Sequence, residues 1–473
     1  MLPRAYELLF STFAFLLGAN IGSFLNVCVY RMPRELSVNQ PRRSFCPSCQ
    51  YQIPWYHNLP LISWLFLRGR CANCGAKFSI RYFGVELLTG LLFLTIWHHV
   101  GIANWPLAFP YWIFVSLLVV ATFIDFEFFI IPDEITWGGT IAGCMLSYLL
   151  PPMMGVETGW FTDLIRALPG ALLAFGCLWM GNSIAGPVGN MKSPRVFGLW
   201  SLAAAASALL FAILLGAPAS VSALLRSLGG AALGYLLLWG VVEAGKKAFG
   251  KKSVQLRAPA PFTWTRTTSE YGDDADLVIG DISWMKAPPK SWLSQLGGRL
   301  KSLFGSREDQ PEQGQRLQWS EMFSRRESDQ LIMHCKSLRI GSDSFENVTA
   351  VAYCDYLLLD GKRYPTDFDQ LEKFSGVVSH LVIPREAMGF GDVKFIAAIG
   401  AFLGWQSVLF TVCSASCIGA VVGVFTILIG KREWSTKIPF GPYLALGSLL
   451  WLFSGPELVD WYFQWVGLDG AAQ

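Results

Sequence analysis

Long apolar runs limit the folds open to this chain more than any other feature of its sequence. Outside one charged segment, the 473 residues fall into runs of about 20 apolar residues, the length of a helix that crosses the hydrocarbon layer of a bilayer. Residues 245–385 hold 20 of the 37 Lys and Arg and 18 of the 34 Asp and Glu. The pattern predicts an all-α polytopic membrane protein with one soluble insert. The net charge of +3 is too small to indicate a nucleic-acid partner.

Ten membrane spans are predicted, and the charges of the loops orient them. The spans are placed at residues 8–30, 82–100, 108–124, 135–150, 163–183, 196–216, 223–244, 393–404, 406–430 and 438–454. The first is interpreted as a retained span, because no small-residue cleavage site follows it. The loop 31–81 holds eight Lys and Arg, whereas the four loops that this count places outside hold none. The positive-inside rule therefore places residues 31–81 in the cytoplasm, although Arg4, Arg166 and Arg226 near the outer ends oppose the assignment.

The same pattern divides the chain into segments. We predict a first span (1–30), a cytoplasmic four-cysteine domain (31–81), membrane helices (82–252), a cytoplasmic insert (253–385), a second membrane segment (386–455) and a short tail (456–473). In the insert, residues 285–318 are polar and rich in Pro, Gly and Ser, which is typical of a linker. Residues 331–340, 348–359 and 377–383 resemble strands, and Asp360-Gly361 predicts a hairpin turn. The insert is therefore expected to be partly β.

Four cysteines form two C-x2-C pairs, Cys46 with Cys49 and Cys71 with Cys74, separated by 21 residues. This spacing is close to that of a zinc ribbon, in which four thiolates close a structural site. The predicted cytoplasmic location keeps thiols reduced and favours metal over a disulfide. A redox pair or a chance spacing remains the alternative interpretation.

Two acids stand at the ends of apolar runs, Asp125 after the third span and Asp392 in the motif G-F-G-D-V-K. Acids at a membrane edge are costly and usually functional, and the span count places both on the cytoplasmic side. Two facing carboxylates that share one proton can hydrolyse a peptide bond. Gly389 and Gly391 beside Asp392 leave room for a substrate backbone.

An ordinary structural role is the alternative for these acids. Each can cap a helix or pair with a cation such as Lys394. Glu127 lies close to Asp125 in the sequence. Asp133 follows Pro132 and precedes a span, as a helix N-cap does.

Six motifs follow one another along the chain. They are residues 22–33 (GSFLNVCVYRMP), the two cysteine pairs, residues 81–90 (RYFGVELLTG), Asp125 with Pro132-Asp133, residues 389–394 (GFGDVK) and residues 438–445 (IPFGPYLA). In this order they resemble the prepilin peptidase (type IV leader peptidase) family of G-x-G-D membrane aspartic peptidases. The resemblance covers residues 1–150, 223–252 and 386–455.

The resemblance implies a bacterial inner-membrane endopeptidase whose active site faces the cytoplasm. It implies that Asp125 and Asp392 are catalytic, supported by Gly389, Gly391, Glu127, Asp133 and Lys394. The substrate would be a type IV prepilin or pseudopilin, cut after a Gly. Many members also methylate the new N-terminus with S-adenosylmethionine, so a second activity is expected. A structural zinc ion at the four cysteines is also expected.

Two insertions depart from the family pattern, namely two extra spans in residues 151–222 and the soluble insert 253–385. The insert is expected to gate Asp392, to bind a pilus or secretion assembly partner, or to be a spacer. Two other functions fit the same acids. They are a proton-coupled transporter, which would show inverted-repeat symmetry, and a catalytically inactive zinc-bearing membrane scaffold.

Overall fold

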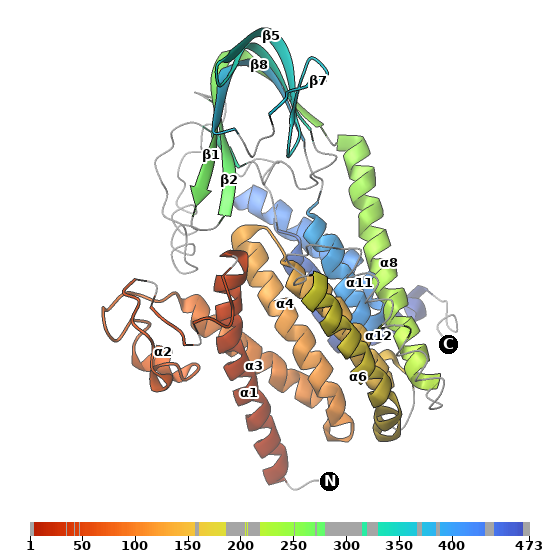
Figure 1. Ribbon diagram of the computed structural model, residues 1–473. Helices are drawn as coiled ribbons and strands as arrows, with labels where there is room; N and C mark the ends of the chain where they lie inside the picture. The colour runs from red at the N-terminus through yellow and green to blue at the C-terminus, as the bar shows by residue number, and fades with distance from the viewer. Residues whose placement is uncertain are drawn as a thin grey trace. The chain divides into compact units, whose positions relative to one another are not determined.

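The computed structural model describes residues 4–34, 36–41, 43–46, 48–156, 160–185, 204, 206, 218–249, 251–269, 272–279, 315–318, 330–366, 371–384, 388–430 and 439–466. These residues belong to two compact units. One comprises Met1–Leu238, Lys290–Ser306 and Gly391–Gln473, and the other comprises Trp239–Pro289 and Arg307–Phe390. The first unit is helical, and the second holds the β-sheet (Figure 1).

The helical unit is built from long apolar helices. The helices are α1 (Arg4–Arg31), α2 (Ile62–Phe66), α3 (Ile80–Val100), α4 (Ala108–Phe128), α5 (Asp133–Leu149), α6 (Trp160–Ala185), α8 (Pro218–Phe249, which continues into the second unit), α11 (Phe390–Gly430) and α12 (Gly441–Val466). Among the residues that the structure describes, five segments are long and apolar enough to cross a membrane, namely Ala5–Arg34, Ile80–Val100, Ile102–Phe128, Pro218–Gly245 and Phe390–Thr426. The predicted multi-pass helical architecture is therefore confirmed, while the count of ten spans stays a prediction.

Two predicted spans lie within the element labelled α11. Residues 393–404 and 406–430 are two helical stretches that meet at Gly404, whose φ of 81° and ψ of 177° are not helical. Glycine reaches this backbone conformation without a steric penalty, so the break between the two stretches falls at Gly404, next to the predicted loop residue 405. The predicted span 196–216 lies outside the described residues, apart from residues 204 and 206.

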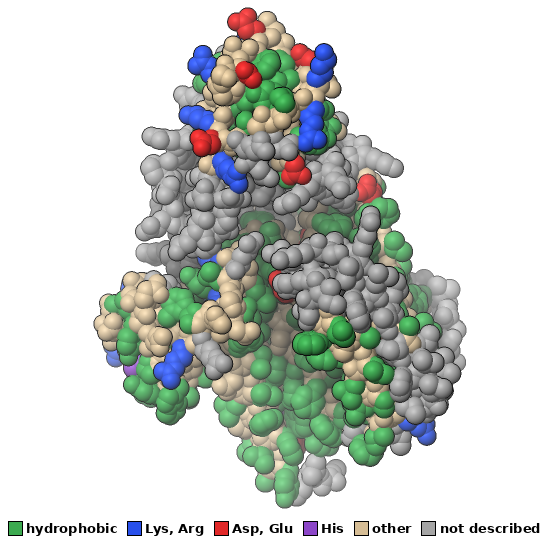
Figure 2. Space-filling model, viewed as in Figure 1, with side chains coloured by type: hydrophobic (Ala, Val, Ile, Leu, Met, Phe, Trp, Pro, Cys, Tyr) green, Lys and Arg blue, Asp and Glu red, His purple; other side chains and the backbone are tan. Residues whose placement is uncertain are grey.

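The outer faces of the membrane helices are apolar. Leu8 of α1, Leu172 of α6 and Val421 of α11 are each largely exposed, as suits side chains that face lipid rather than water. Figure 2 shows hydrophobic side chains covering the visible helices, whereas Lys, Arg, Asp and Glu gather on the sheet. The uneven charge distribution of the sequence thus separates a membrane part from a water-exposed part.

Small residues allow the helices to approach closely. A Cβ added to Gly22 of α1 would lie 2.8 Å from the Cα of Glu86 in α3. At the contact of α8 with α11, a Cβ on Gly230 or on Gly400 would lie 2.3 Å from the other residue's carbonyl oxygen. Close backbone contact through glycine is a common way to pack helices in a bilayer. These contacts position α3 and α11, which carry residues of the candidate site.

The second unit contains an eight-stranded antiparallel sheet. Its strands are β1 (Lys251–Ser269), β2 (Gly272–Ile279), β3 (Gln315–Gln318), β4 (Leu331–Ile340), β5 (Asp343–Ala352), β6 (Leu357–Leu359), β7 (Lys362–Arg363) and β8 (Lys373–Pro384). They are ordered β3-β2-β1-β8-β4-β5-β6-β7. β1 and β8 pair along their length, so that Lys251 lies opposite Pro384. The chain therefore enters and leaves the sheet at neighbouring points.

The sheet packs one apolar face into its own core. Trp264 of β1 stacks on Phe374 of β8 at a ring distance of 5.0 Å, and the alternate residues of β4 are buried beside them. The predicted partly β insert is confirmed. Asp360 and Gly361 form the predicted turn between β6 and β7, both with positive φ. β3 lies at the end of the predicted linker 285–318, whose other residues are outside the described part of the chain.

Candidate active site

Asp125 lies in the last turn of α4, where the chain leaves the helix. Phe129 ends the helix in the left-handed conformation, and its N–H donates to the carbonyl oxygen of Asp125. The Asp125 side chain is 5% exposed. Its Oδ2 accepts a hydrogen bond of 2.9 Å from the backbone N–H of Gly441 at the start of α12. Because α12 packs against α4, this carboxylate is held by two elements.

Asp392 lies in the first turn of α11 and is 8% exposed. Its Oδ1 is buried and has no hydrogen-bond partner among the residues that the structure describes. Gly391, next to Asp392, and Gly441, whose N–H binds Asp125, both lie against Ile131, so the segments that carry the two acids meet at this residue. Two acids from distant parts of the sequence therefore meet at one place, and one of them keeps an unpaired oxygen.

Ile131 fills the space beside the two acids. It lies in the loop between α4 and α5 and is buried. A Cβ on Gly391 would lie 3.3 Å from the Cβ of Ile131, and one on Gly441 would lie 3.0 Å from its Cδ1. The first turns of α11 and α12 can approach this loop because both positions are glycine. Gly389 precedes α11 in the connecting loop.

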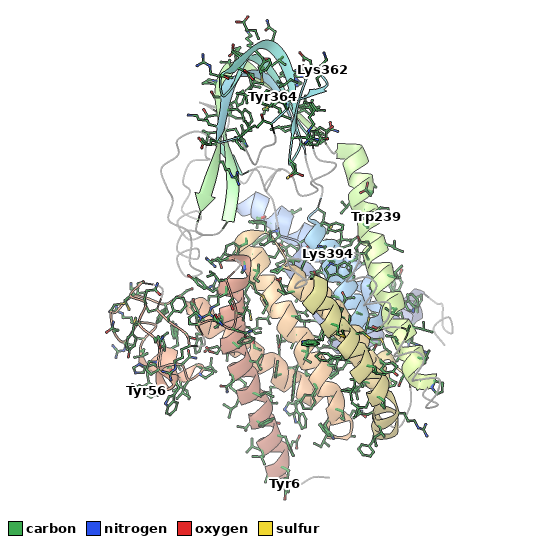
Figure 3. All side chains as sticks on the ribbon, in the orientation of Figure 1. Tyr6, Tyr56, Trp239, Lys362, Tyr364 and Lys394 are labelled. Atoms are coloured by element: carbon green, nitrogen blue, oxygen red, sulfur yellow. The ribbon has the colours of Figure 1, made fainter. Side chains whose placement is uncertain are left out.

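Two ion pairs hold the surrounding elements. The Nζ of Lys394 lies 2.6 Å from the Oδ1 of Asp133, which joins α11 to the start of α5; Figure 3 labels Lys394 on α11. Arg81 of α3 pairs with Glu127 of α4. The interpretation of Asp133 as an N-cap is wrong, because Pro132 occupies that position and Asp133 is the first helical residue. Its carboxylate joins two helices.

A pair of buried carboxylates gives this site a defined chemistry. When two carboxyl groups face each other, repulsion disfavours the doubly charged form, and the pair holds one proton near neutral pH. The charged member can accept a proton from water, and the protonated member can donate a hydrogen bond to a carbonyl oxygen. The proton belongs to the pair rather than to either residue. Such a site can hydrolyse an amide bond without a metal ligand.

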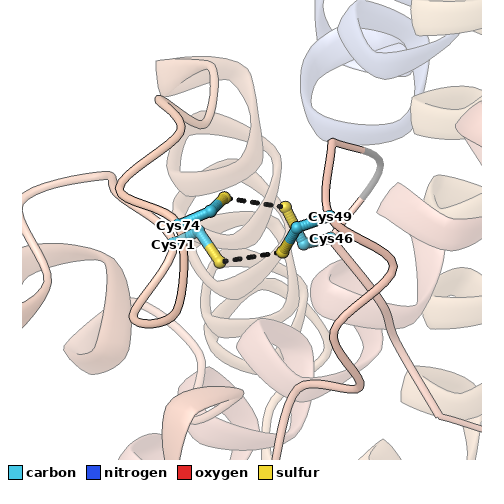
Figure 4. Close-up of side chains that lie close together, drawn as sticks. All are labelled: Cys46, Cys49, Cys71 and Cys74. Atoms are coloured by element: carbon cyan, nitrogen blue, oxygen red, sulfur yellow. Dashed lines mark hydrogen bonds between the residues drawn. The ribbon is translucent and has the colours of Figure 1, made fainter.

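The four predicted cysteines come together in the segment between α1 and α3 (Figure 4). The Sγ atoms of Cys46 and Cys74 are 3.9 Å apart, as are those of Cys49 and Cys71. All four sulfurs lie within 4.8 Å of one another. A disulfide needs sulfur atoms about 2.05 Å apart, so this arrangement is not that of two disulfides.

The sulfur cluster fits a tetrahedral zinc ion. Four thiolates at about 2.3 Å from zinc lie about 3.8 Å from one another, which is close to the observed 3.9 Å. The backbone N–H groups of Cys74 and Asn73 lower the pKa of the Cys71 thiol to about 7. This stabilises the thiolate, which is the form that binds metal. A closed set of four ligands would give zinc a structural role.

Three contributors to the site were not identified from the sequence as site residues. Gly441 donates to Asp125, Ile131 fills the adjacent space, and Arg81 pairs with Glu127. Gly441 and Arg81 lie in recognised motifs, and their place in those motifs could have identified them as site residues. No local pattern distinguishes Ile131 from any other apolar loop residue.

Comparisons with known proteins agree with this geometry. Residues 16–100 match the bacterial peptidase A24 N-terminal domain, and residues 350–424 match the type IV leader peptidase family. A protein of Myxococcus xanthus (strain DK1622) named prepilin leader peptidase/N-methyltransferase is 36% identical over 57% of this chain and 76% of its own length. One of the same name from Aeromonas hydrophila is 32% identical over 41% of this chain and 73% of its own length.

A third relative carries a different name. The type 4 prepilin-like proteins leader peptide-processing enzyme of Escherichia coli O78:H11 (strain H10407 / ETEC) is 33% identical over 42% of this chain and 82% of its own length. No solved structure matches the chain. The matches to the family models and the extent of these relatives lead to one conclusion, which is that this chain belongs to the type IV leader peptidase family.

Proposed function

We propose that this protein is a membrane aspartic endopeptidase that cleaves the leader peptide of type IV prepilins or pseudopilins, with Asp125 and Asp392 as its catalytic pair. The observation that carries the proposal is that two buried acids are carried by segments that meet at Ile131, and that one of them, Asp392, has an unpaired Oδ1. Transport by a proton-coupled mechanism or an inactive scaffold is not favoured, because the relatives are named as leader peptidases.

In the proposed reaction, a water lies between the two carboxyl groups. The charged carboxylate takes a proton from this water, which attacks the scissile carbonyl while the protonated carboxyl polarises its oxygen. Gly441 donates to Asp125 Oδ2 and so fixes the orientation of that carboxylate. Gly391 lets the first turn of α11 lie against Ile131, because an added Cβ there would lie only 3.3 Å from the Cβ of Ile131.

The membrane setting explains the proposed cleavage site. A prepilin has a short basic leader followed by an apolar N-terminal helix, and the cut falls after a Gly between the two. An active site at the cytoplasmic end of α4 and α11 would let the substrate helix lie in the bilayer. We propose that the protein is in the inner membrane with this face in the cytoplasm and with ten spans. The insert 253–385 is proposed to bind a pilus or secretion assembly partner.

The proposed activity extends to the new N-terminus. The relatives' names include N-methyltransferase, so S-adenosylmethionine is the proposed methyl donor. Zinc at Cys46, Cys49, Cys71 and Cys74 is proposed to fold the segment between α1 and α3, and the four sulfurs lie at the required spacing.

Cleavage of a purified prepilin in detergent tests the catalytic pair. Asp125→Asn and Asp392→Asn each remove one ionisable group while keeping its shape, so we expect cleavage to fall at least about 1,000-fold. Asp460→Asn, at an exposed position of α12, is the matched control and should cleave like the unmodified protein. Full cleavage by either active-site variant would refute the assignment.

A further inference from the structure

Large apolar side chains are exposed on the segment between α1 and α3. Six of them fall within residues 55–66, namely Trp55, Tyr56, Leu59, Ile62, Leu65 and Phe66, and the two at the ends are the most exposed, Trp55 at 78% and Phe66 at 84%. Ile62, Leu65 and Phe66 share one face of α2, because residues three and four apart are neighbours on a helix surface. We call these six residues the apolar patch. An exposed group of this kind marks a contact site.

The opposite face of α2 is fixed to the rest of the protein. The ring of Trp64 lies 5.3 Å from that of Phe83 in α3, and the N–H of Leu61 donates to Oε2 of Glu86, also in α3, at 2.7 Å. The hydroxyl of Ser63 donates to the carbonyl oxygen of Tyr56, which ties the first part of the patch to α2. The apolar patch is therefore held on α3 by its inner side and presents its outer side.

The length of α3 places the contact with Glu86 inside the membrane. α3 has 21 residues, so it is about 32 Å long, which matches the hydrocarbon layer of about 30 Å. Ile80 begins α3 and lies at one boundary of that layer, and Glu86 lies about 9 Å further along the helix. In Figure 3, Tyr56 lies at the level of the membrane helices rather than beyond their ends. The apolar patch therefore borders lipid and not open water.

The charge of the segment also suits a lipid surface. Residues 36–80 contain five Lys and Arg and no Asp or Glu, and the segment stays positive when four thiolates and one zinc ion are counted. Arg68 and Arg70 directly follow the apolar patch and are exposed. Anionic headgroups attract basic side chains near the membrane surface, and Trp and Tyr are enriched at that interface.

We propose that the apolar patch inserts into the lipid surface beside α3, with Arg68 and Arg70 facing anionic headgroups. The segment that carries the four cysteines then lies on the bilayer instead of projecting into the water. An apolar face flanked by basic residues is the composition of elements that lie in the plane of a membrane interface. The proposal concerns this surface alone and does not depend on the reaction that the protein catalyses.

Photocrosslinking of the full-length protein in a bilayer tests the occupant of the patch. The photoreactive amino acid p-benzoylphenylalanine replaces Phe66, or Trp55 in a second variant, and the protein is reconstituted in nanodiscs of equal amounts of radiolabelled phosphatidylcholine and phosphatidylglycerol. After irradiation, each position should carry lipid within about threefold of the yield for the same replacement at Leu8, an exposed residue of α1. Replacement of Lys362, exposed on β7, is the control and should carry at least about tenfold less.

Two results would overturn the proposal. One is lipid labelling at positions 55 and 66 as low as at position 362. The other is crosslinking of the patch to a second copy of this chain or to added prepilin in preference to lipid. Both replaced side chains are largely exposed, so the replacements open no cavity in the core, and size-exclusion chromatography checks that each variant is folded.

The headgroup contact of the two arginines is measured in the same nanodiscs. The share of phosphatidylglycerol in the lipid crosslinked at position 66 is compared with its share in the disc. We expect an enrichment of about threefold, which Arg68→Gln combined with Arg70→Gln should abolish. Lys336→Gln combined with Arg339→Gln, at exposed positions of β4, is the matched control and should leave the enrichment unchanged. An enrichment that survives the loss of Arg68 and Arg70 would refute their contact with headgroups.

Discussion

At the scale of single residues, the site depends on backbone groups as much as on acids. The N–H of Gly441 fixes one oxygen of Asp125, and Gly391 lets the residue before Asp392 lie against Ile131. Both approaches rely on the absence of a side chain at a helix start. Substitutions beside the acids therefore test the geometry without removing a carboxylate.

Gly441→Ala should lower kcat for prepilin cleavage about tenfold to 100-fold with little change in KM. The added Cβ would lie 2.7 Å from Oδ2 of Asp125, so the carboxylate must move, and small displacements of reacting groups cost rate. Gly138→Ala on α5 is the control, because its Cβ would meet no atom within 4 Å. Unchanged kinetics for Gly441→Ala would argue against this contact.

The ion pair of Lys394 and Asp133 should make one joint contribution to the stability of the protein. Both side chains are partly exposed, so their coupling to stability should be below about 1 kcal/mol. In a double-mutant cycle, we expect Lys394→Met, Asp133→Asn and the double variant to lower the midpoint of thermal unfolding by about the same amount relative to the unmodified protein. If the decrease in the midpoint for the double variant equalled the sum of the two single decreases, the two residues would act independently.

At the scale of elements, the segment between α1 and α3 depends on its sulfur cluster. Cys46→Ser and Cys71→Ser should each lower the zinc content of the purified protein and increase proteolysis of residues 31–81, because a structural zinc site contributes folding energy. Cys413→Ser, at an exposed position of α11, is the control. Metal analysis that finds no zinc in the unmodified protein would remove the claim.

Acid should release this zinc. The pKa of Cys71 is lowered from 9.0 to about 7 by the backbone N–H groups of Cys74 and Asn73. The Cys71 thiolate therefore predominates above about pH 7 and is protonated below it, so zinc affinity should fall as the pH drops through about 7. Competition with a metal indicator at several pH values measures this effect.

The sequence predicted those elements that a local pattern specifies. Long apolar runs identified the helices, and apolar alternation identified β4 and part of β8. β1 was not predicted. Phe262 and Trp264 alternate with Thr in it, but Pro259 and Pro261 are residues that weaken the signal of a strand. The cysteine spacing predicted the sulfur cluster. Pairings between distant segments, such as Lys394 with Asp133, could not be predicted because no local pattern encodes them.

At the scale of the whole molecule, the sheet can be tested as a separable part. Replacing residues 253–382 with a short Gly-Ser linker should leave the helical unit folded, because Lys251 and Pro384 are paired neighbours and a few residues span that gap. Cleavage of prepilin in detergent should be retained within about threefold. Loss of cleavage by a stably folded deletion variant would show that the sheet acts on Asp392.

Because the two ends of the sheet are neighbours, the number of residues between Asp125 and Asp392 does not determine how far apart they lie in the fold. Because strands β1 and β8 leave side by side, the sheet adds more than a hundred residues of chain without requiring the flanking helices to separate. Gain or loss of such a module in a single genetic event would leave the encounter of the two acids untouched. The length of polypeptide between the two acids can thus change while their spacing in the folded protein stays the same.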